Sequence, residues 1–337
     1  SYDNVTYLTG FTGDSSYLLL TRDGQIVVSD RRYTTQLESE CPNIDLSIRG
    51  PETEMLEAVA KVVRKAKVAS LAIEASSVTL ESSQKLAEKL PKVALVPTSG
   101  LVERLREIKD KDEIAEIREA IGIAERAFAV VKAGLRPEQT EKQVADELER
   151  QVRLFGGECT AFWPIVGVGP NGALPHYRPG RVKMEESFMV LVDWGAKARL
   201  YLSDLTRIIV TGKAPAKFER VYNVVLQAQQ KAIEAIRPGA ILEDVDAVAR
   251  KVITDAGFGK QFGHSLGHGF GLQIHEQPRL AVNQKRPLEP GMVVTVEPGI
   301  YIPGWAGVRI EDDILVTKDG HEVLSNVPKE YADCVIS

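Results

Sequence analysis

Five residues of types that bind metal ions lie in mostly apolar surroundings in the second half of the chain. They are Asp193, Asp204, His268, Glu297 and Glu311. Asp193 follows the apolar run 188–192, and Glu297 follows the mostly apolar run 292–296. An ionised carboxylate in a buried strand costs free energy unless a positive partner meets it. We therefore expect the four carboxylates to share a partner, and metal ions are the simplest one.

The chemical types of these five side chains indicate which metal ions the site would bind. Four carboxylates and one imidazole suit Mn²⁺, Co²⁺, Fe²⁺ or Zn²⁺ in a two-metal site better than a thiolate-type structural zinc. Two ions about 3.5–4 Å apart can share one water, lower its pKa and polarise a carbonyl group. A single aspartate in a strand is more often a turn or ion-pair residue, but five such residues together favour a metal centre.

Histidines are concentrated near this set. Three of the five in the chain, His264, His268 and His275, lie within twelve residues in a glycine-rich segment, and His176 lies in the turn-rich loop 169–177. Loop histidines beside a metal site are candidate proton carriers and hydrogen-bond donors to substrate.

Arg309 has the same strand parity as Glu311, so both side chains are expected on one side of the strand. Arg309 could hold a metal ligand or a substrate carbonyl group. The alternative is an ordinary ion pair with Asp313.

Residues 1 to about 100 are expected to form a mixed α/β unit. Strands at 17–21 and 25–29 are joined by Asp23-Gly24, which is a hairpin signal. A helix is expected over 51–67, followed by short strands at 68–73 and 93–96, the second ended by Pro97. The densely charged stretch 105–113 is typical of a linker.

The second part contains an internal repeat. A long helix with Ile114, Ile117, Ile121, Ala124 and Phe128 on one face opens it. Helices are then expected over 140–155, with capping-box spacing between Thr140 and Gln143, and over 242–256. Segment 184–195 aligns with 288–299, so Asp193 matches Glu297 at an offset of 104, and Asp204 matches Glu311 at 107. We expect two related halves with a pseudo-twofold axis and the carboxylates near it.

Composition limits the alternatives. At 337 residues the chain is long enough for two domains, and its net charge of −5 argues against a general nucleic-acid binder. No apolar run approaches the ~18 residues that span a bilayer, so no membrane partner is expected. Three well-separated cysteines, Cys41, Cys159 and Cys334, are typical of reduced thiols in a cytoplasmic protein.

These motifs resemble one family. The five ligand-type residues, together with segments 267–272, 297–301 and 307–313, resemble the aminopeptidase P and prolidase branch of the pita-bread metallopeptidases. Segment 7–13 is similar to the entry into the family's N-terminal domain. The resemblance implies an α+β protein. A creatinase-like α/β domain at 1–104, lacking its first strand and helix, would precede a catalytic pita-bread domain at 105–337.

The resemblance also implies residue roles. Asp193 would chelate one metal ion, His268 the other, and Asp204 and Glu311 would bridge both; the ions are expected to be Mn²⁺, with Co²⁺, Zn²⁺ or Fe²⁺ as alternatives. Glu297 would bind beside the bridging water and act as general base. The remaining residues would bind substrate: His176 and His275 at the scissile carbonyl, and His264, Tyr301 and Arg309 on the proline side. A homodimer is implied as well.

Several functions stay open. An aminopeptidase P cuts Xaa-Pro-Yaa and longer peptides, whereas a prolidase needs the free carboxylate of a dipeptide. A methionine aminopeptidase lacks the phrase found at 297–301, and a creatinase-type enzyme or a histone-chaperone-type binding module would have lost ligands. A metal-dependent interaction protein without catalysis is the alternative from another class.

Overall fold

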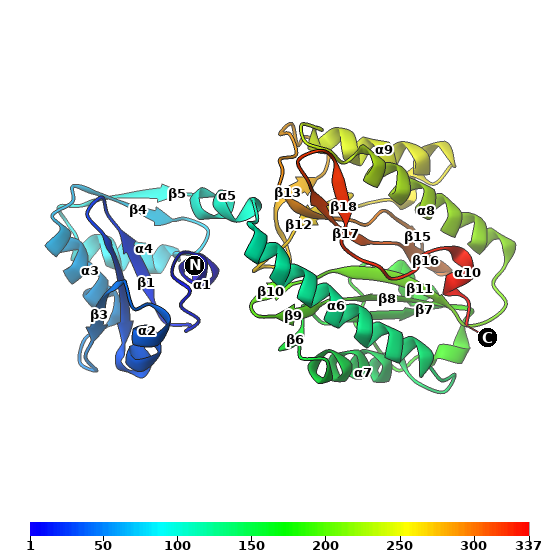
Figure 1. Ribbon diagram of the computed structural model, residues 1–337, viewed down its shortest axis with the longest axis horizontal. Coiled ribbons are helices and arrows are strands. Elements are labelled where there is room, and N and C mark those ends of the chain that lie inside the picture. The colour runs from blue at the N-terminus through cyan, green and yellow to red at the C-terminus, as the bar shows by residue number, and fades with distance from the viewer. Residues whose placement is uncertain (337) are drawn as a thin grey trace. The chain divides into compact units, whose positions relative to one another are not determined.

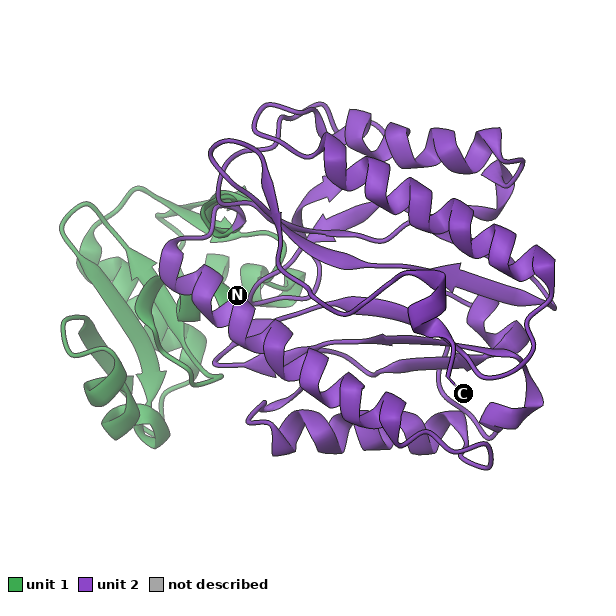
Figure 2. Ribbon diagram, turned by 45° about the vertical axis from the view of Figure 1, so that its right-hand side comes forward, with its two compact units in different colours: residues 1–106 green, residues 107–337 purple. Residues whose placement is uncertain are grey.

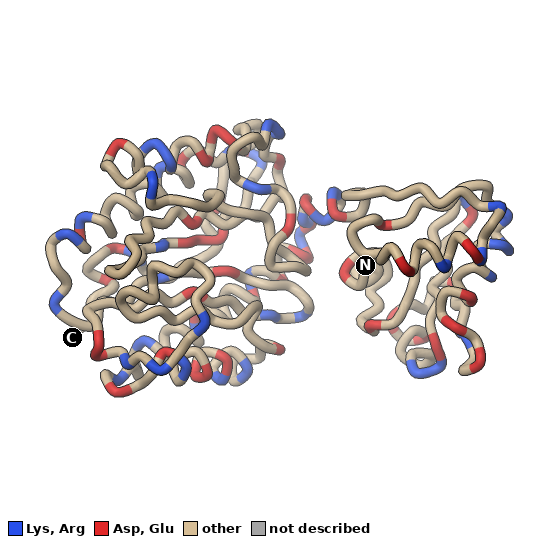
Figure 3. Tube along the Cα trace, turned by 180° about the vertical axis from the view of Figure 1, so that it is seen from behind, with Lys and Arg blue, Asp and Glu red and all other residues tan. Residues whose placement is uncertain are grey.

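The computed structural model describes residues 1–336. These residues divide into two compact units, with the division between Arg106 and Glu107 (Figures 1 and 2). Each unit has its own hydrophobic core. Acidic and basic positions are mixed over the outer helices of both (Figure 3). Among the described residues, no helix is long and apolar enough to cross a membrane.

The first unit contains two small sheets. Strands β1 (Tyr17–Leu20) and β2 (Gln25–Asp30) form the expected antiparallel hairpin, and β3 (Asp45–Arg49) pairs parallel to β2. Strands β4 (Ser70–Glu74) and β5 (Ala94–Thr98) form a separate parallel pair. The other elements of the unit are α1 (Tyr2–Thr9), η1 (Arg31–Tyr33), α2 (Thr34–Glu40), α3 (Met55–Ala66), α4 (Leu80–Lys89) and α5 (Leu101–Glu107).

One expectation about this region is wrong in detail. Pro97 does not end its strand but lies inside β5, which a two-stranded sheet tolerates because each strand has an open edge. The charged stretch 105–113 contains the boundary between the two units, but Glu107 and Lys109 within it are buried. Glu107 pairs with Arg286 at 2.5 Å, and Lys109 pairs with Glu276 at 3.7 Å.

The second unit begins with α6 (Lys111–Ala133). Asp110 caps it, because its carboxylate accepts the backbone N–H of Asp112 and Glu113 while Glu113 bonds back to the Asp110 N–H. On the predicted face of this helix Ile117, Ile121, Ala124 and Phe128 are buried and Ile114 is half-buried. Phe128 stacks on Trp194 with ring centroids 4.2 Å apart.

The rest of this unit consists of helices and short strands. Its elements are α7 (Glu141–Leu154), β6 (Cys159–Thr160), β7 (Ile165–Val168), η2 (Gly169–Ala173), η3 (Met184–Glu186), β8 (Met189–Trp194), β9 (Ala196–Ala198), β10 (Tyr201–Leu202), β11 (Leu205–Val210), α8 (Ala216–Ala235), α9 (Leu242–Asp255), η4 (Gly259–Gln261), β12 (Gly267–Gly269), β13 (Glu276–Leu280), β14 (Val293–Val296), β15 (Gly299–Ile302), β16 (Ala306–Arg309), β17 (Asp312–Val316), β18 (His321–Val323) and α10 (Tyr331–Cys334). Helices α6 and α7 lie on one side of the strands, and α8 and α9 lie on the other (Figure 1).

The predicted repeat is visible in the pairing of strands. One sheet has the order β11-β8-β7, and the equivalent strands β17-β14-β12 are consecutive in the five-stranded sheet. An isolated β-bridge also occurs at a corresponding place in each half: Thr140 pairs with Lys183 in the first half, and Ile241 pairs with Pro287 in the second. A further bridge joins the two sheets, where the Glu311 N–H donates to the Thr206 carbonyl at 3.2 Å. The two halves therefore meet at the strands that carry the predicted ligands.

Candidate metal centre and active site

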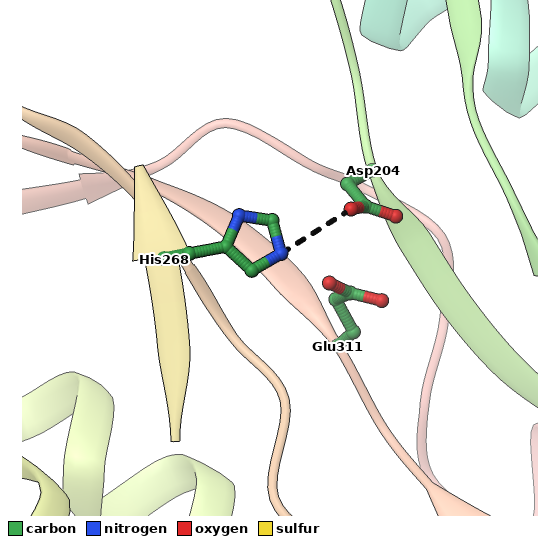
Figure 4. A group of neighbouring side chains, drawn as sticks. All are labelled: Asp204, His268 and Glu311. Atoms are coloured by element: carbon green, nitrogen blue, oxygen red, sulfur yellow. Dashed lines mark ion pairs between the residues drawn. The ribbon is translucent and has the colours of Figure 1, made fainter. Parts of the chain in front are cut away.

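Asp204, His268 and Glu311 converge in the interior of the second unit. One ligand atom from each lies within 4.8 Å of the others, and all three residues are buried (Figure 4). Asp204 lies directly before β11, His268 is the central residue of β12, and Glu311 lies between β16 and β17. Three segments far apart in the chain thus bring two carboxylates and one imidazole together.

Glu297 and Asp193 lie beside this group at equivalent places in the two halves. Glu297 directly follows β14, and its Oε1 is 3.4 Å from His268 Nε2. Asp193 lies near the end of β8 and forms an ion pair with Arg309. The pKa of Asp204 is raised well above its usual range by burial, and next by the charges of Glu311, Asp193 and Glu297. All five predicted ligand residues therefore belong to one electrostatic cluster.

His268 is prepared to accept rather than donate at Nε2. Its Nδ1 lies 3.0 Å from the Gly269 carbonyl oxygen, and only a protonated Nδ1 can donate there. The Nε2 lone pair then faces Asp204 and Glu297. Burial lowers the pKa of His268 to about 3, so the neutral ring is the form present near neutral pH. A neutral imidazole with a carbonyl behind it is the form that ligates metals.

The four carboxylates of the cluster carry more negative charge than the guanidinium of Arg309 beside them can balance. Burial is the largest cause that raises the pKa of Asp193, Asp204, Glu297 and Glu311, and it brings Glu297 to about 8. Asp193 Oδ1 is buried and has no hydrogen-bond partner. Divalent cations would supply the missing charge, and this set of hard oxygen donors with one imidazole fits them.

Arg309 is the one cation inside the cluster among residues 1–336. It pairs with Asp193, donates from Nε to Thr206 Oγ1 at 3.1 Å and from Nη1 to the Tyr301 hydroxyl at 2.8 Å. The alternative of an ion pair with Asp313 is wrong, because the guanidinium turns toward β8 and β15. Arg309 thus holds a ligand-type residue and begins a hydrogen-bond chain.

That chain continues to His264. The Tyr301 hydroxyl lies 2.9 Å from His264 Nε2, and His264 Nδ1 lies 2.7 Å from the Ser265 carbonyl oxygen. Since Nδ1 donates to the carbonyl, Nε2 accepts from Tyr301, whose oxygen accepts from Arg309. Burial lowers the pKa of His264 to about 4 and raises that of Tyr301 to about 12. The three predicted substrate residues, His264, Tyr301 and Arg309, therefore form one hydrogen-bonded network beside the ligand-type residues. The histidine in this network is neutral.

The two loop histidines are exposed and face the same region. The His275 and His268 rings contact each other with centroids 4.4 Å apart. His176 lies on the loop after η2, and an electrostatic interaction with it, secondary to that with Arg309, opposes the burial that raises the pKa of Asp193. A shallow depression lined by Ala161, Leu202, Leu272 and His275, among others, opens at this side.

The roles of three buried residues of the site did not emerge from the sequence, where Asp313 was considered only as a partner of Arg309. Thr206 Oγ1 donates to Glu311 at 2.6 Å and accepts from Arg309, and Thr295 Oγ1 lies 3.3 Å from Glu297 Oε1 and accepts the His268 N–H at 3.1 Å. Asp313 accepts the Asp204 backbone N–H at 3.3 Å. Strand parity with Asp204 was the available signal for Thr206, whereas nothing local indicated the partner of Asp313.

Comparison with known proteins decides the family. The model for metallopeptidase family M24 matches residues 115–318, and that for the creatinase/prolidase N-terminal domain matches residues 1–108. The chain belongs to metallopeptidase family M24. It shares 37% identity over 330 residues with the uncharacterized peptidase YqhT of Bacillus subtilis, covering 98% of this chain and 93% of that protein.

Solved M24 structures with 38% and 33% identity have the same architecture. An Xaa-Pro dipeptidase from Bacillus anthracis superposes with a TM-score of 0.96 and 38% identity, covering 100% of this chain and 93% of the other. An X-Pro aminopeptidase from Thermotoga maritima superposes with a TM-score of 0.91 and 33% identity, covering 98% and 93%. The predicted fold, a creatinase-type N-terminal domain and a pita-bread domain, is confirmed. The protein is a metallopeptidase of the Xaa-Pro branch.

Proposed function

We propose that this M24 protein is an Xaa-Pro aminopeptidase, which hydrolyses the bond between an N-terminal residue and proline. The observation that carries the proposal is the juxtaposition of two groups of residues. Five ligand-type side chains share one buried cluster, and the Arg309–Tyr301–His264 chain lies directly beside it. The first group can hold divalent metal ions, and the second places the rings of Tyr301 and His264 beside them.

Each ligand-type residue has a proposed part. Asp193, Asp204, His268, Glu297 and Glu311 would hold two divalent ions, with Asp204 and Glu311 between them. When bound, such ions activate a water and polarise a carbonyl group. Glu297 would take the proton of the attacking water and pass it to the leaving nitrogen, since its carboxylate borders the cluster beside His268.

The substrate residues divide between the two sides of the scissile bond. His176 and His275 would donate hydrogen bonds to the carbonyl oxygen, whose negative charge grows as water attacks. His264, Tyr301 and Arg309 would line the proline ring. The amide before proline has no N–H, so recognition must rest on shape rather than on a hydrogen bond to that nitrogen.

The broader setting of the enzyme is part of the proposal. We propose Mn²⁺ as the native ion, with Co²⁺, Zn²⁺ and Fe²⁺ as competitors, because the donor set is mostly oxygen. We also propose a cytoplasmic homodimer whose functional domains are 1–104 and 105–337. The compact units, divided between Arg106 and Glu107, support a boundary in this segment.

An Xaa-Pro dipeptidase is the second candidate, since one relative at 38% identity has that name. The test is a parallel assay of Xaa-Pro and Xaa-Pro-Yaa peptides with Mn²⁺. An aminopeptidase has the higher kcat/KM on the tripeptide. Cleavage of the dipeptide alone would establish the second candidate, and cleavage of neither would reject both.

A further inference from the structure

Glu141 is a fully buried carboxylate outside the ligand cluster. It is the first residue of α7, where a negative charge favours the helix dipole. Its side chain has four neutral hydrogen-bond donors. Oε1 accepts from the Val168 N–H and Asn171 Nδ2, both at 2.8 Å, and Oε2 accepts from the Tyr177 hydroxyl at 2.8 Å and the Gly180 N–H at 3.0 Å.

These donors come from both ends of one loop. Val168 ends β7, Asn171 lies in η2, and Tyr177 and Gly180 lie on the returning segment. His176 lies between them, next to Tyr177. The carboxylate therefore closes the loop 168–180 at its base, and the loop is short enough that fixing its base restricts His176.

Two further features fix the same loop. The Pro175 carbonyl oxygen accepts from Arg309 Nη2 at 3.4 Å, which ties the residue before His176 to the cluster. Gly180 lets the chain approach closely, since a Cβ there would lie 2.9 Å from the Tyr177 hydroxyl oxygen. The loop thus has one anchor at Glu141 and another at Arg309.

The second half repeats the arrangement with different residues. Asp246 on α9 is fully buried, and its Oδ1 accepts the Leu266 N–H at 3.0 Å. Arg250, paired with Asp246, donates to the carbonyl oxygens of Phe262 at 3.2 Å and His264 at 3.0 Å. In each half, a buried acid on the second helix holds the loop that carries a histidine of the site.

We propose that Glu141 is a positioning residue for His176, and that its four hydrogen bonds set the rate of catalysis through that imidazole. The inference rests on the proposed function, because it assigns to His176 the binding of the scissile carbonyl. Glu141 itself contacts none of the reacting groups. Its role is to keep His176 where the negative charge of the carbonyl oxygen develops.

Glu141→Gln is the discriminating substitution. A carboxamide has one oxygen and one NH₂ group, whereas the site presents a backbone N–H to each carboxylate oxygen. Either orientation of the glutamine therefore places NH₂ against the Val168 or the Gly180 N–H, and a flip of the amide cannot repair both. We expect kcat to fall by about 10- to 100-fold, because small displacements of a catalytic group have effects of that size. Metal content should be unchanged.

Four further variants separate positioning from general damage. Asp146→Asn is the matched control, because Asp146 lies on the same helix with its side chain exposed and paired to Lys142. His176→Ala should lower kcat with metal content unchanged. The double variant Glu141→Gln/His176→Ala should be no slower than His176→Ala alone. If the double variant lowers kcat by the product of the two separate effects, the proposal is overturned. Tyr177→Phe, which keeps the carboxylate and removes one donor, should change kcat in the same direction by less.

Amide hydrogen exchange tests the loop without any substrate. Glu141→Gln should speed exchange over 168–180 and leave 262–266 unchanged, whereas Asp246→Asn should do the reverse. Unchanged exchange over 168–180 overturns the proposal. If the parent enzyme cleaves no Xaa-Pro peptide, the proposed function fails; faster loop exchange in that protein would show only that Glu141 orders the loop, and the catalytic role would be rejected with the function.

Discussion

Asp204 and Glu311 are the carboxylates that the cluster surrounds most closely. The pKa of each is raised well above its usual range, first by burial and then by neighbouring carboxylates. Both belong to the group whose ligand atoms lie within 4.8 Å. A residue in that position can contact more than one ion, which is the basis for assigning both as bridges.

Asp204→Ala or Glu311→Ala should therefore abolish turnover while leaving the fold intact. Even residues that only orient metal ligands change activity by about 10- to 100-fold, so a lost bridge should cost more than that. The measurement is Xaa-Pro peptide hydrolysis after metal removal and reconstitution, with circular dichroism as the check on folding. Glu185→Ala, at an exposed position, is the control. Hydrolysis at the parent rate by either variant would show that the bridging assignment is wrong.

At the scale of elements, the loop before β13 depends on a buried ion pair. Lys109 and Glu276 are paired at 3.7 Å with side chains only 1% and 6% exposed. Glu276 Oε1 also accepts the Gln273 N–H at 2.8 Å, so the pair fixes the segment that carries His275. Loss of one partner leaves the other charge buried.

We expect Lys109→Met and Glu276→Gln each to lower the free energy of unfolding by about 3–5 kcal/mol. The double variant should lose less than the sum of the two, because the residues interact directly. Urea unfolding monitored by tryptophan fluorescence measures these values. The exposed pair Lys142–Asp146 is the comparison, where Lys142→Met should cost under about 1 kcal/mol. Additive effects at Lys109 and Glu276 would mean that the pair is not coupled.

The start of η1 in the first unit depends on pH. Hydrogen bonds from the Arg32 side chain are the largest cause that lowers the pKa of Asp30 from 3.8 to about 2, and Arg49 adds to it. A carboxylate with a lowered pKa in the folded state stabilises that state above its unfolded pKa. Its contribution is therefore complete above about pH 4 and is lost as pH falls toward 2.

Asp30→Asn should accordingly weaken this region near neutral pH and matter little at pH 2. The readout is hydrogen exchange over 25–33, compared between parent and variant at pH 6 and at pH 2–3. Faster exchange in the variant at pH 6 should shrink as pH falls. A difference that is constant with pH would show that packing, and not the Asp30 charge, is responsible.

The sequence predicted the positions of the ligand-type residues better than it predicted the contacts of the residues around them. Residue types, apolar flanks and the repeat sufficed to predict that Asp193 and Glu297 occupy equivalent places, because they lie at the ends of equivalent strands. The partner of Arg309 could not be chosen, because strand parity fixes a side and not which neighbour from another segment lies there. The burial of Glu107 and Lys109 was not predicted, for a related reason. Their partners, Arg286 and Glu276, are more than 160 residues away in the chain.

At the scale of the whole molecule, the two units should respond differently to metal removal. All three tryptophans, Trp163, Trp194 and Trp305, lie in the second unit, and Trp194 directly follows Asp193. Ions that bind only the folded state stabilise it by about 2.7 kcal/mol at a free concentration about 100 times Kd. Clustered carboxylates without ions lose that stabilisation.

Treatment with a chelator should therefore lower the midpoint of the tryptophan-monitored thermal transition, and added Mn²⁺ should restore it. Hydrogen exchange over 25–30, in the first unit, should not change. Asp204→Ala serves as the control, because a protein that cannot hold both ions should respond less. An equal response in parent and variant would place the stabilising ion outside the proposed site.

The pseudo-twofold construction also has a consequence for synthesis on the ribosome. Asp193 and Asp204 belong to the first half, whereas His268, Glu297 and Glu311 belong to the second. A nascent chain that ends before Glu311 has strands and helices but only part of the donor set. If these five residues hold the ions as proposed, the complete donor set exists only after both halves have left the exit tunnel and folded together, so metal uptake would be a late event in maturation.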